Sequence, residues 1–141
     1  MQGLMKYISL ISRCAIQRQG EAFSDIGLKG NQCGYLFQIS RNPGLSQDQL
    51  AQALHVNRSN VTRQLAILEK NGFVERRRHP GDARILSVYP TEKTLDNMGL
   101  IRQFIHAYSD YLTEDFTPDE KKQFLFFLER AAQKADAEGK S

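Results

Sequence analysis

The stretch Leu45–Tyr89 reads LSQDQLAQALHVNRSNVTRQLAILEKNGFVERRRHPGDARILSVY and decides the fold. Ser46, with Gln49 three residues later, forms a capping-box pattern and predicts the start of a helix. Asn57 follows a short turn and is a good N-cap for a second helix over 58–71, because its side chain can accept a hydrogen bond from a free backbone N–H. The pattern therefore predicts two helices joined by a tight turn.

Two short strands are predicted directly after this pair of helices. Residues 73–78 (FVERRR) and 85–89 (ILSVY) are separated by 79–83 (HPGDA), which is turn chemistry. A helix-turn-helix followed by a hairpin is typical of a winged helix-turn-helix, in which the second helix enters the DNA major groove.

Further helices are expected on both sides of this motif. A first helix begins near Leu4 and is predicted to end near Gly20, because glycine commonly closes a helix. A second helix fits 29–40. Thr91 is predicted to cap a long fifth helix, and Pro118 to open a sixth, since proline suits the first helical turn.

The predicted fold is mainly α with a small β-hairpin wing. We expect three parts, with a winged helix-turn-helix core over 28–90 and dimerisation helices over 1–27 and 91–141. The flanking helices carry more apolar surface than one small domain needs. A second copy of the chain packed on them, related by a twofold axis, would cover that surface.

Positive charge is concentrated in one quarter of the chain. Residues 55–90 hold seven Arg and Lys against three Asp and Glu, a net of +4. The whole chain carries +3, so the remainder carries −1. Such a basic patch indicates an anionic partner, and double-stranded DNA fits the motif that carries it.

The start of the second motif helix and the hairpin supply the candidate DNA-binding residues. Arg suits guanine, Asn suits adenine, and Ser or Thr suits phosphate. An arginine on the hairpin suits a narrow minor groove, with a neighbouring acid to orient it. The candidates are Asn57, Arg58, Ser59, Asn60, Thr62, Arg63, Arg76, Arg77, Arg78, Asp82 and Arg84.

Other classes of protein find less support in the sequence. There is no Gly-rich phosphate loop, no nucleophile–base–acid set and no zinc-type spacing of Cys and His, so we expect neither an enzyme nor a metal or cofactor site. No apolar run is long enough to cross a membrane, and we expect a cytoplasmic protein. A winged-helix protein-interaction module without DNA binding is the alternative, although such modules usually lose the basic wing.

The chain resembles the multiple-antibiotic-resistance regulator (MarR) family over about residues 28–115. The resemblance is densest from Leu45 to Thr94, and LEKNGFVERR with Asp82 and Arg84 is its most specific segment. The first helix looks short for the family, and the helix after Thr91 begins TEKTLDNMG rather than with the family's Gly-containing start.

This resemblance implies a homodimeric winged-helix regulator on palindromic promoter DNA, often a repressor released by a small ligand or by oxidation. It places Asn57 to Arg63 at the start of the recognition helix, Arg84 as the minor-groove arginine and Asp82 as its brace. A pocket for an aromatic or other hydrophobic effector is expected near Tyr7, Ile11, Tyr35 and Met98. Redox sensing through Cys14 or Cys33 is a further alternative.

Overall fold

The structure is a computed structural model that describes residues 3–138. The elements in chain order are α1 (Gly3–Phe23), the short 3₁₀ helices η1 (Ser24–Ile26) and η2 (Gly30–Gln32), α2 (Cys33–Arg41), β1 (Leu45–Ser46), α3 (Gln47–Leu54), α4 (Arg58–Lys70), β2 (Val74–His79), β3 (Asp82–Pro90), α5 (Glu92–Leu112) and α6 (Pro118–Glu138). Two compact units form, of which the first reaches Ile105 and the second begins at His106. The fold is mainly helical with a small sheet, as the sequence predicts.

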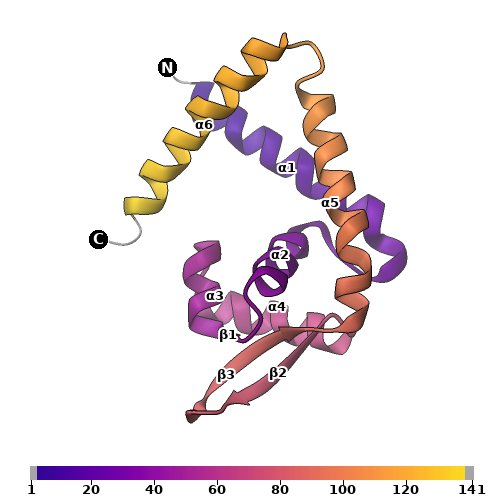
Figure 1. Cartoon of the computed structure of the whole chain (residues 1–141), viewed down its shortest axis with the longest axis vertical. Coiled ribbons are helices and arrows are strands. Elements are labelled where there is room, and N and C mark those ends of the chain that lie inside the picture. The colour runs from indigo at the N-terminus through magenta and orange to yellow at the C-terminus, as the bar shows by residue number, and fades with distance from the viewer. Residues whose placement is uncertain (1–2, 139–141) are drawn as a thin grey trace. The chain divides into compact units, whose positions relative to one another are not determined.

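The sheet has three antiparallel strands in the order β1-β3-β2, one strand more than the sequence analysis expected. Strand β1 is only Leu45–Ser46, and its residues pair with Val88 and Ser87. The hairpin is also longer than predicted, because β2 reaches His79 and β3 begins at Asp82. It extends away from the helices of the first unit as a two-stranded arm (Figure 1).

The predicted helix caps are confirmed. Ser46 Oγ accepts the backbone N–H of Gln49 at 3.1 Å, and Gln49 Oε1 accepts the backbone N–H of Ser46 at 2.8 Å. Asn57 Oδ1 accepts the backbone N–H of Asn60 at 2.8 Å. These bonds satisfy N–H groups that a helix start leaves without intrahelical partners, so both motif helices begin where the sequence predicts.

The core of the first unit joins α2, α3 and α4 to the sheet and to the first half of α5. Leu36, Leu65 and Phe73 are fully buried, and Met98 and Ile101 bring α5 into the same cluster. Burial of such side chains contributes on the order of 1.5–3 kcal/mol each, so this cluster fixes the orientation of α4. The buried apolar residues are Leu28, Cys33, Tyr35, Leu36, Ile39, Leu50, Ala51, Val61, Leu65, Leu68, Phe73, Val74, Val88, Met98 and Ile101.

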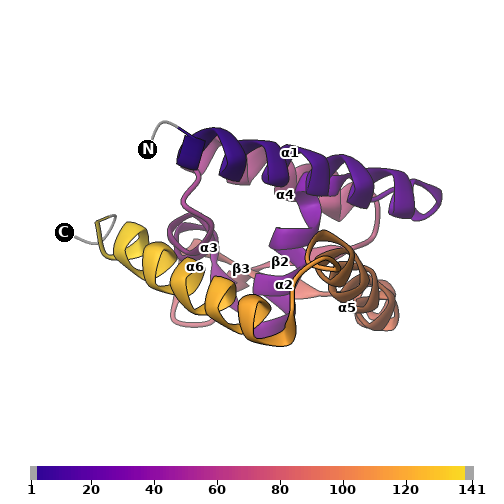
Figure 2. The same ribbon diagram turned by 90° about the horizontal axis from the view of Figure 1, so that it is seen from above.

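The first helix is longer than predicted, and the predicted stop at Gly20 is wrong. Helix α1 continues without a break to Phe23 (Figure 2), so its 21 residues also correct the expectation of a short helix. Glycine is needed here for close approach rather than for a turn. A Cβ on Gly30 would lie 1.8 Å from the carbonyl oxygen of Ile16, so α1 crosses η2 backbone to backbone.

The second helix begins at Cys33 rather than at Lys29. The preceding residues form a tighter 3₁₀ turn, in which Gln32 N–H donates to Lys29 O at 3.0 Å and Lys29 N–H donates to Gln32 Oε1 at 2.9 Å. This turn carries Gly30, which lies against α1. Among the described residues, no helix is long and apolar enough to cross a membrane.

Candidate nucleic-acid interface

The exposed start of α4 carries most of the predicted base-reading side chains. Asn57 holds the helix start, and Ser59 Oγ also donates to Asn57 Oδ1 at 2.9 Å. Arg63 Nη2 donates to Asn60 Oδ1 at 2.7 Å, so a guanidinium and an amide lie together one turn into the helix. This pairing leaves the other guanidinium N–H groups of Arg63 free to donate to an acceptor outside the helix.

Two further candidates of α4 have partners in α3. Arg58 Nε lies 2.7 Å from Asp48 Oδ1, in a pair whose side chains are 79% and 58% exposed. Thr62 Oγ1 donates to the carbonyl of Arg58 at 3.0 Å and accepts from Gln47 Nε2 at 3.4 Å. A surface pair such as Arg58–Asp48 contributes at most about 1 kcal/mol, and a phosphate can compete for the arginine.

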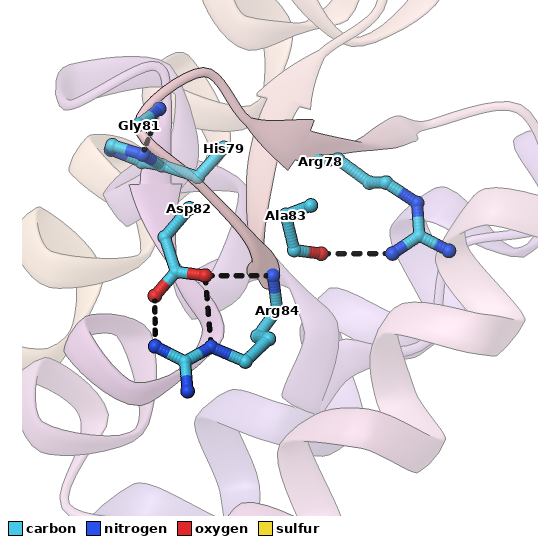
Figure 3. A network of polar contacts seen from close by, with 6 residues as sticks. All are labelled: Arg78, His79, Gly81, Asp82, Ala83 and Arg84. Carbon is cyan, nitrogen blue, oxygen red and sulfur yellow. Dashed lines mark hydrogen bonds and ion pairs between the residues drawn. The ribbon is translucent and has the colours of Figure 1, made fainter.

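The wing tip presents an arginine held by a carboxylate (Figure 3). Asp82 Oδ1 accepts Arg84 Nε at 3.0 Å, and Asp82 Oδ2 accepts Arg84 Nη2 at 2.9 Å. The Arg84 backbone N–H donates to Asp82 Oδ1 as well, at 3.0 Å. These bonds from Arg84 lower the pKa of Asp82, while Asp82 raises the pKa of Arg84.

The Arg84 side chain is 90% exposed, so its orientation comes from Asp82 and from no core contact. The predicted pairing of these two residues is confirmed. A charged group held in one direction on a narrow hairpin is the arrangement that a minor groove admits. On the same tip, the backbone N–H of Gly81 donates to His79 Nδ1 at 3.0 Å and helps to hold the turn.

The three consecutive wing arginines point to different partners, as alternation on a strand requires. Arg78 Nη1 donates to the carbonyl of Ala83 at 2.8 Å and is exposed (Figure 3). Arg77 pairs with Glu75 at 2.7 Å and stacks on the Tyr89 ring, with its guanidinium carbon 4.5 Å from the ring centre.

Arg76 differs from its neighbours because its side chain is only 20% exposed. Its Nη2 and its backbone N–H donate to the two carboxylate oxygens of Glu69 in α4, at 3.0 and 3.1 Å. Its Nη1 donates to Gln47 Oε1 at 3.4 Å. Arg76 therefore ties β2 to both helices of the motif. Sequence reasoning missed Gln47 and Glu69, whose roles depend on contacts 29 and 7 residues away.

Glu69 gives a pH-dependent contribution to stability. The hydrogen bond from Arg76 holds its pKa below the ordinary 4.5. A depressed folded-state pKa means that the stabilisation is present above the ordinary pKa and is lost as the pH falls through the folded pKa. Because Glu69 is 40% exposed, we expect only about 0.5 kcal/mol.

Thermal melts at pH 7 and pH 3 test this with Glu69→Gln. The variant should be slightly less stable than the wild type at pH 7, and the difference between the two should shrink at pH 3. A difference of the same size at both pH values would show that the carboxylate charge contributes nothing.

The predicted effector residues divide into two groups. Tyr35 and Met98 are 4% and 2% exposed and lie in the core, and burial raises the pKa of Tyr35. The Tyr35 hydroxyl has no hydrogen-bond partner within residues 3–138. Tyr7 and Ile11 are 62% and 43% exposed on α1. An effector pocket at these residues stays a prediction.

The two cysteines differ in environment. Cys33 is buried in the core, and burial raises the pKa of its thiol to about 11. The reactive thiolate is therefore scarce at neutral pH. Cys14 is half-buried on α1. Within residues 3–138, no group of three or more His, Cys, Asp or Glu side chains is placed to hold a metal ion.

Comparison with known proteins agrees with this geometry. The MarR family pattern matches residues 28–86, from the last residues before η2 to the middle of β3. A solved structure of MarR is 32% identical, superposes with a TM-score of 0.88, and covers 94% of this chain and 90% of its own. The chain belongs to the MarR family. MarR proteins are transcriptional regulators rather than enzymes.

Two further relatives match most of the chain. A protein of Bacillus subtilis (strain 168), described as the uncharacterized HTH-type transcriptional regulator YybA, is 28% identical over 92% of this chain and 87% of its own. A MarR family regulator from Listeria monocytogenes, solved with a 26mer DNA, is 23% identical with a TM-score of 0.88 over 99% and 93% of the two chains. At that identity the Listeria structure shows the shared winged-helix fold.

Proposed function

We propose that this MarR protein binds a palindromic operator as a homodimer in the cytoplasm and represses transcription. The observation that carries the proposal is the wing arginine Arg84, which is exposed and held by Asp82. The Listeria relative of the same fold was solved with a 26mer DNA, which supports the same partner for this chain.

We assign different tasks to the candidate residues. Asn60, Arg63 and Arg58 read base edges from α4, and Ser59 and Thr62 contact phosphates. Arg84 enters the minor groove, while Arg77 and Arg78 contact the DNA phosphate backbone on either side of that groove. Asn57, Asp82 and Arg76 hold the others in position, because each uses its polar atoms within the protein.

A second copy of the chain is the proposed partner for the apolar side chains of the flanking helices. On α6, Phe124 to Leu128 are between 38% and 57% exposed. On α1, Leu4, Tyr7 and Ile11 are between 43% and 62% exposed. Exposed apolar patches of this kind mark interaction surfaces, and a symmetric dimer would remove them from solvent.

Release by a small aromatic or hydrophobic effector is part of the proposal. Tyr7 and Ile11, on the proposed dimer helix α1, would contact it, and Tyr35 and Met98 would respond through the core. Oxidation is a weaker alternative, because the buried Cys33 favours its protonated thiol. Cys14 is the more accessible candidate for that route.

Fluorescence anisotropy with DNA from upstream of the gene, and with random duplex as the control, tests the function. We expect tight binding that prefers the upstream DNA and falls steeply with salt, as phosphate contacts require. Equal binding to both duplexes across several upstream fragments would overturn the sequence-specific function, and absent binding to both would favour the protein-interaction module.

Arg63→Ala is expected to relax sequence preference by about tenfold, since a bidentate contact to guanine contributes about 1–3 kcal/mol of discrimination. Binding to random duplex should change less. Competition between operator and random DNA measures the ratio. If both affinities fell equally, Arg63 would be a phosphate contact instead. Asn60→Ala is the companion variant, because it removes the amide that holds Arg63 in position.

A further inference from the structure

The turn that follows the recognition helix, residues 71–73, is held by Thr91 and the first residues of α5. The backbone carbonyl of Gly72 accepts a hydrogen bond from Thr91 Oγ1, and the carbonyl of Phe73 accepts one from Thr94 Oγ1. The backbone N–H of Thr91 also donates to Phe73 O, at 3.1 Å. Thr94 is fully buried, so its hydroxyl bond is made away from water.

Lys93 completes this set from the solvent side. Its Nζ donates to the carbonyl of Asn71 at 2.8 Å and lies 4.2 Å from the centre of the Phe73 ring. A lysine at the C-terminal end of a helix also complements the negative end of the helix dipole. The carbonyls of three consecutive residues, 71–73, are thus each bound by a side chain of residues 91–94.

The carbonyls of residues 71–73 lie beyond Lys70, the last residue of α4, so these bonds are not needed to complete the helix. Here α4 already has its own ending, with Gly72 at φ 82° and the backbone N–H of Phe73 donating to Leu68 O at 2.8 Å. The bonds from α5 therefore join two elements rather than finish one. These bonds fix the orientation of α4 relative to α5.

We propose that Thr91, Lys93 and Thr94 are positioning residues. They determine which separation of the two DNA half-sites the dimer prefers. The inference rests on the proposed function, because it needs a dimer that presents two α4 helices to one operator. Helix α5 carries exposed Leu95 and Leu100 and runs on to Leu112, so it belongs to the proposed dimer surface. A fixed joint between α5 and α4 carries the dimer geometry to the helix that reads DNA.

Loosening the joint between α5 and α4 should mainly affect the preference for one half-site spacing. Each α4 could still bind its own half-site, since Arg58, Asn60 and Arg63 lie at the opposite end of the helix. The two half-sites would no longer have to stand one helical turn apart. The predicted signature is a loss of spacing preference with little change in affinity for a single half-site.

The experiment measures binding to operators in which the half-site separation is shortened or lengthened by one and two base pairs. The wild type should lose on the order of tenfold in affinity at the wrong spacing, within the range of ordinary coupling between sites. The double variant Thr91→Val with Thr94→Val should lose less than about threefold in affinity between the correct and the wrong spacing. The single variant Thr94→Ser keeps the hydroxyl and should keep the wild-type spacing preference.

Two variants guard against misfolding. Lys93→Met is at an exposed position and keeps a long apolar stem over the Phe73 ring, so it should fold and show a partial loss of spacing preference. Thr113→Val is the matched control, because the hydroxyl of buried Thr113, the residue after α5, donates to the carbonyls of Ser109 and Asp110 in the last turn of that helix. It should keep the full preference. Circular dichroism checks that each variant is folded.

The outcomes separate this inference from the proposed function. If the wild type does not prefer operator to random duplex, the proposed function fails and the inference fails with it. If the wild type binds the operator specifically, but either lacks spacing preference or shares it unchanged with the double variant and Lys93→Met, only the positioning role is overturned.

Discussion

Arg84→Ala weakens operator binding by about 1–3 kcal/mol, which is roughly 5- to 150-fold in the dissociation constant, and leaves the fold intact. The arginine side chain is 90% exposed and touches no core residue, so its loss costs the folded protein little. On DNA, the same side chain would be desolvated against the phosphates of a narrow groove, where its charge counts most. Anisotropy titrations with operator DNA measure the change, and a thermal melt checks the fold.

Variants of neighbouring and distant residues make this test specific. Arg18→Ala is the matched control, because Arg18 is also an exposed arginine paired with an acid, Glu21, but it lies on α1. It should bind operator as the wild type does. Arg84→Lys keeps the charge without the fork that Asp82 holds, and should fall between wild type and Arg84→Ala. Unchanged affinity for Arg84→Ala would remove the minor-groove role.

Asp82→Asn separates orientation from charge at the same place. The substitution removes an acid that repels phosphate, yet it also weakens the bonds that direct the Arg84 guanidinium. If orientation dominates, operator binding weakens while binding to random duplex rises or stays equal. If repulsion dominates, both affinities rise. The ratio of the two affinities therefore decides which effect of Asp82 matters.

Local patterns in the sequence were sufficient to predict the motif. The caps at Ser46 and Asn57, the hairpin and the Asp82–Arg84 pair depend on residues two or three apart, and the structure confirms each of them. Short-range hydrogen bonds of this kind follow from side-chain length and backbone geometry. The order of the helices could also be predicted locally, since each helix carries its own apolar stripe.

Features that depend on distant partners were not predictable. Strand β1 exists only because Leu45 meets Val88 across the sheet. Arg76 reads as one of three equivalent wing cations until Glu69 and Gln47 are seen around it. The sequence shows that these residues are polar, but it does not show which of them meet. Only the fold separates a bracing arginine from a DNA-facing one.

Gly20 shows the same limit from the opposite direction. A glycine near the end of an apolar stripe is typical of a helix end, and that interpretation was wrong. The residue lies inside α1 and faces η2, with the backbone nitrogen of Gly30 3.4 Å from where a Cβ of Gly20 would lie. Two glycines at one crossing are a tertiary feature without a local signature.

Gly30→Ala tests this crossing and should destabilise the protein by about 3 kcal/mol, at the upper end of the cost of overpacking. The added Cβ would lie 1.8 Å from the carbonyl oxygen of Ile16 and 3.0 Å from the backbone nitrogen of Gly20. Both are backbone atoms of α1, so no side-chain rotation relieves the overlap. Helix α1 must move away from η2. A fall in melting temperature of about 10 °C is expected for a chain of this size.

Two neighbouring glycines supply the controls for Gly30→Ala. Gly34 lies in α2, and a Cβ there would meet only Leu54 Cδ2 at 3.8 Å, so Gly34→Ala should raise stability by about 0.5–1 kcal/mol through helix propensity. Gly20→Ala places its Cβ at an ordinary 3.4 Å from Gly30 and should change stability little. If Gly30→Ala had the same melting temperature as these two controls, α1 would not cross η2 at this distance in solution. If Gly30→Ala alone melts early, the close crossing is what attaches α1, the proposed dimer helix, to the DNA-binding motif.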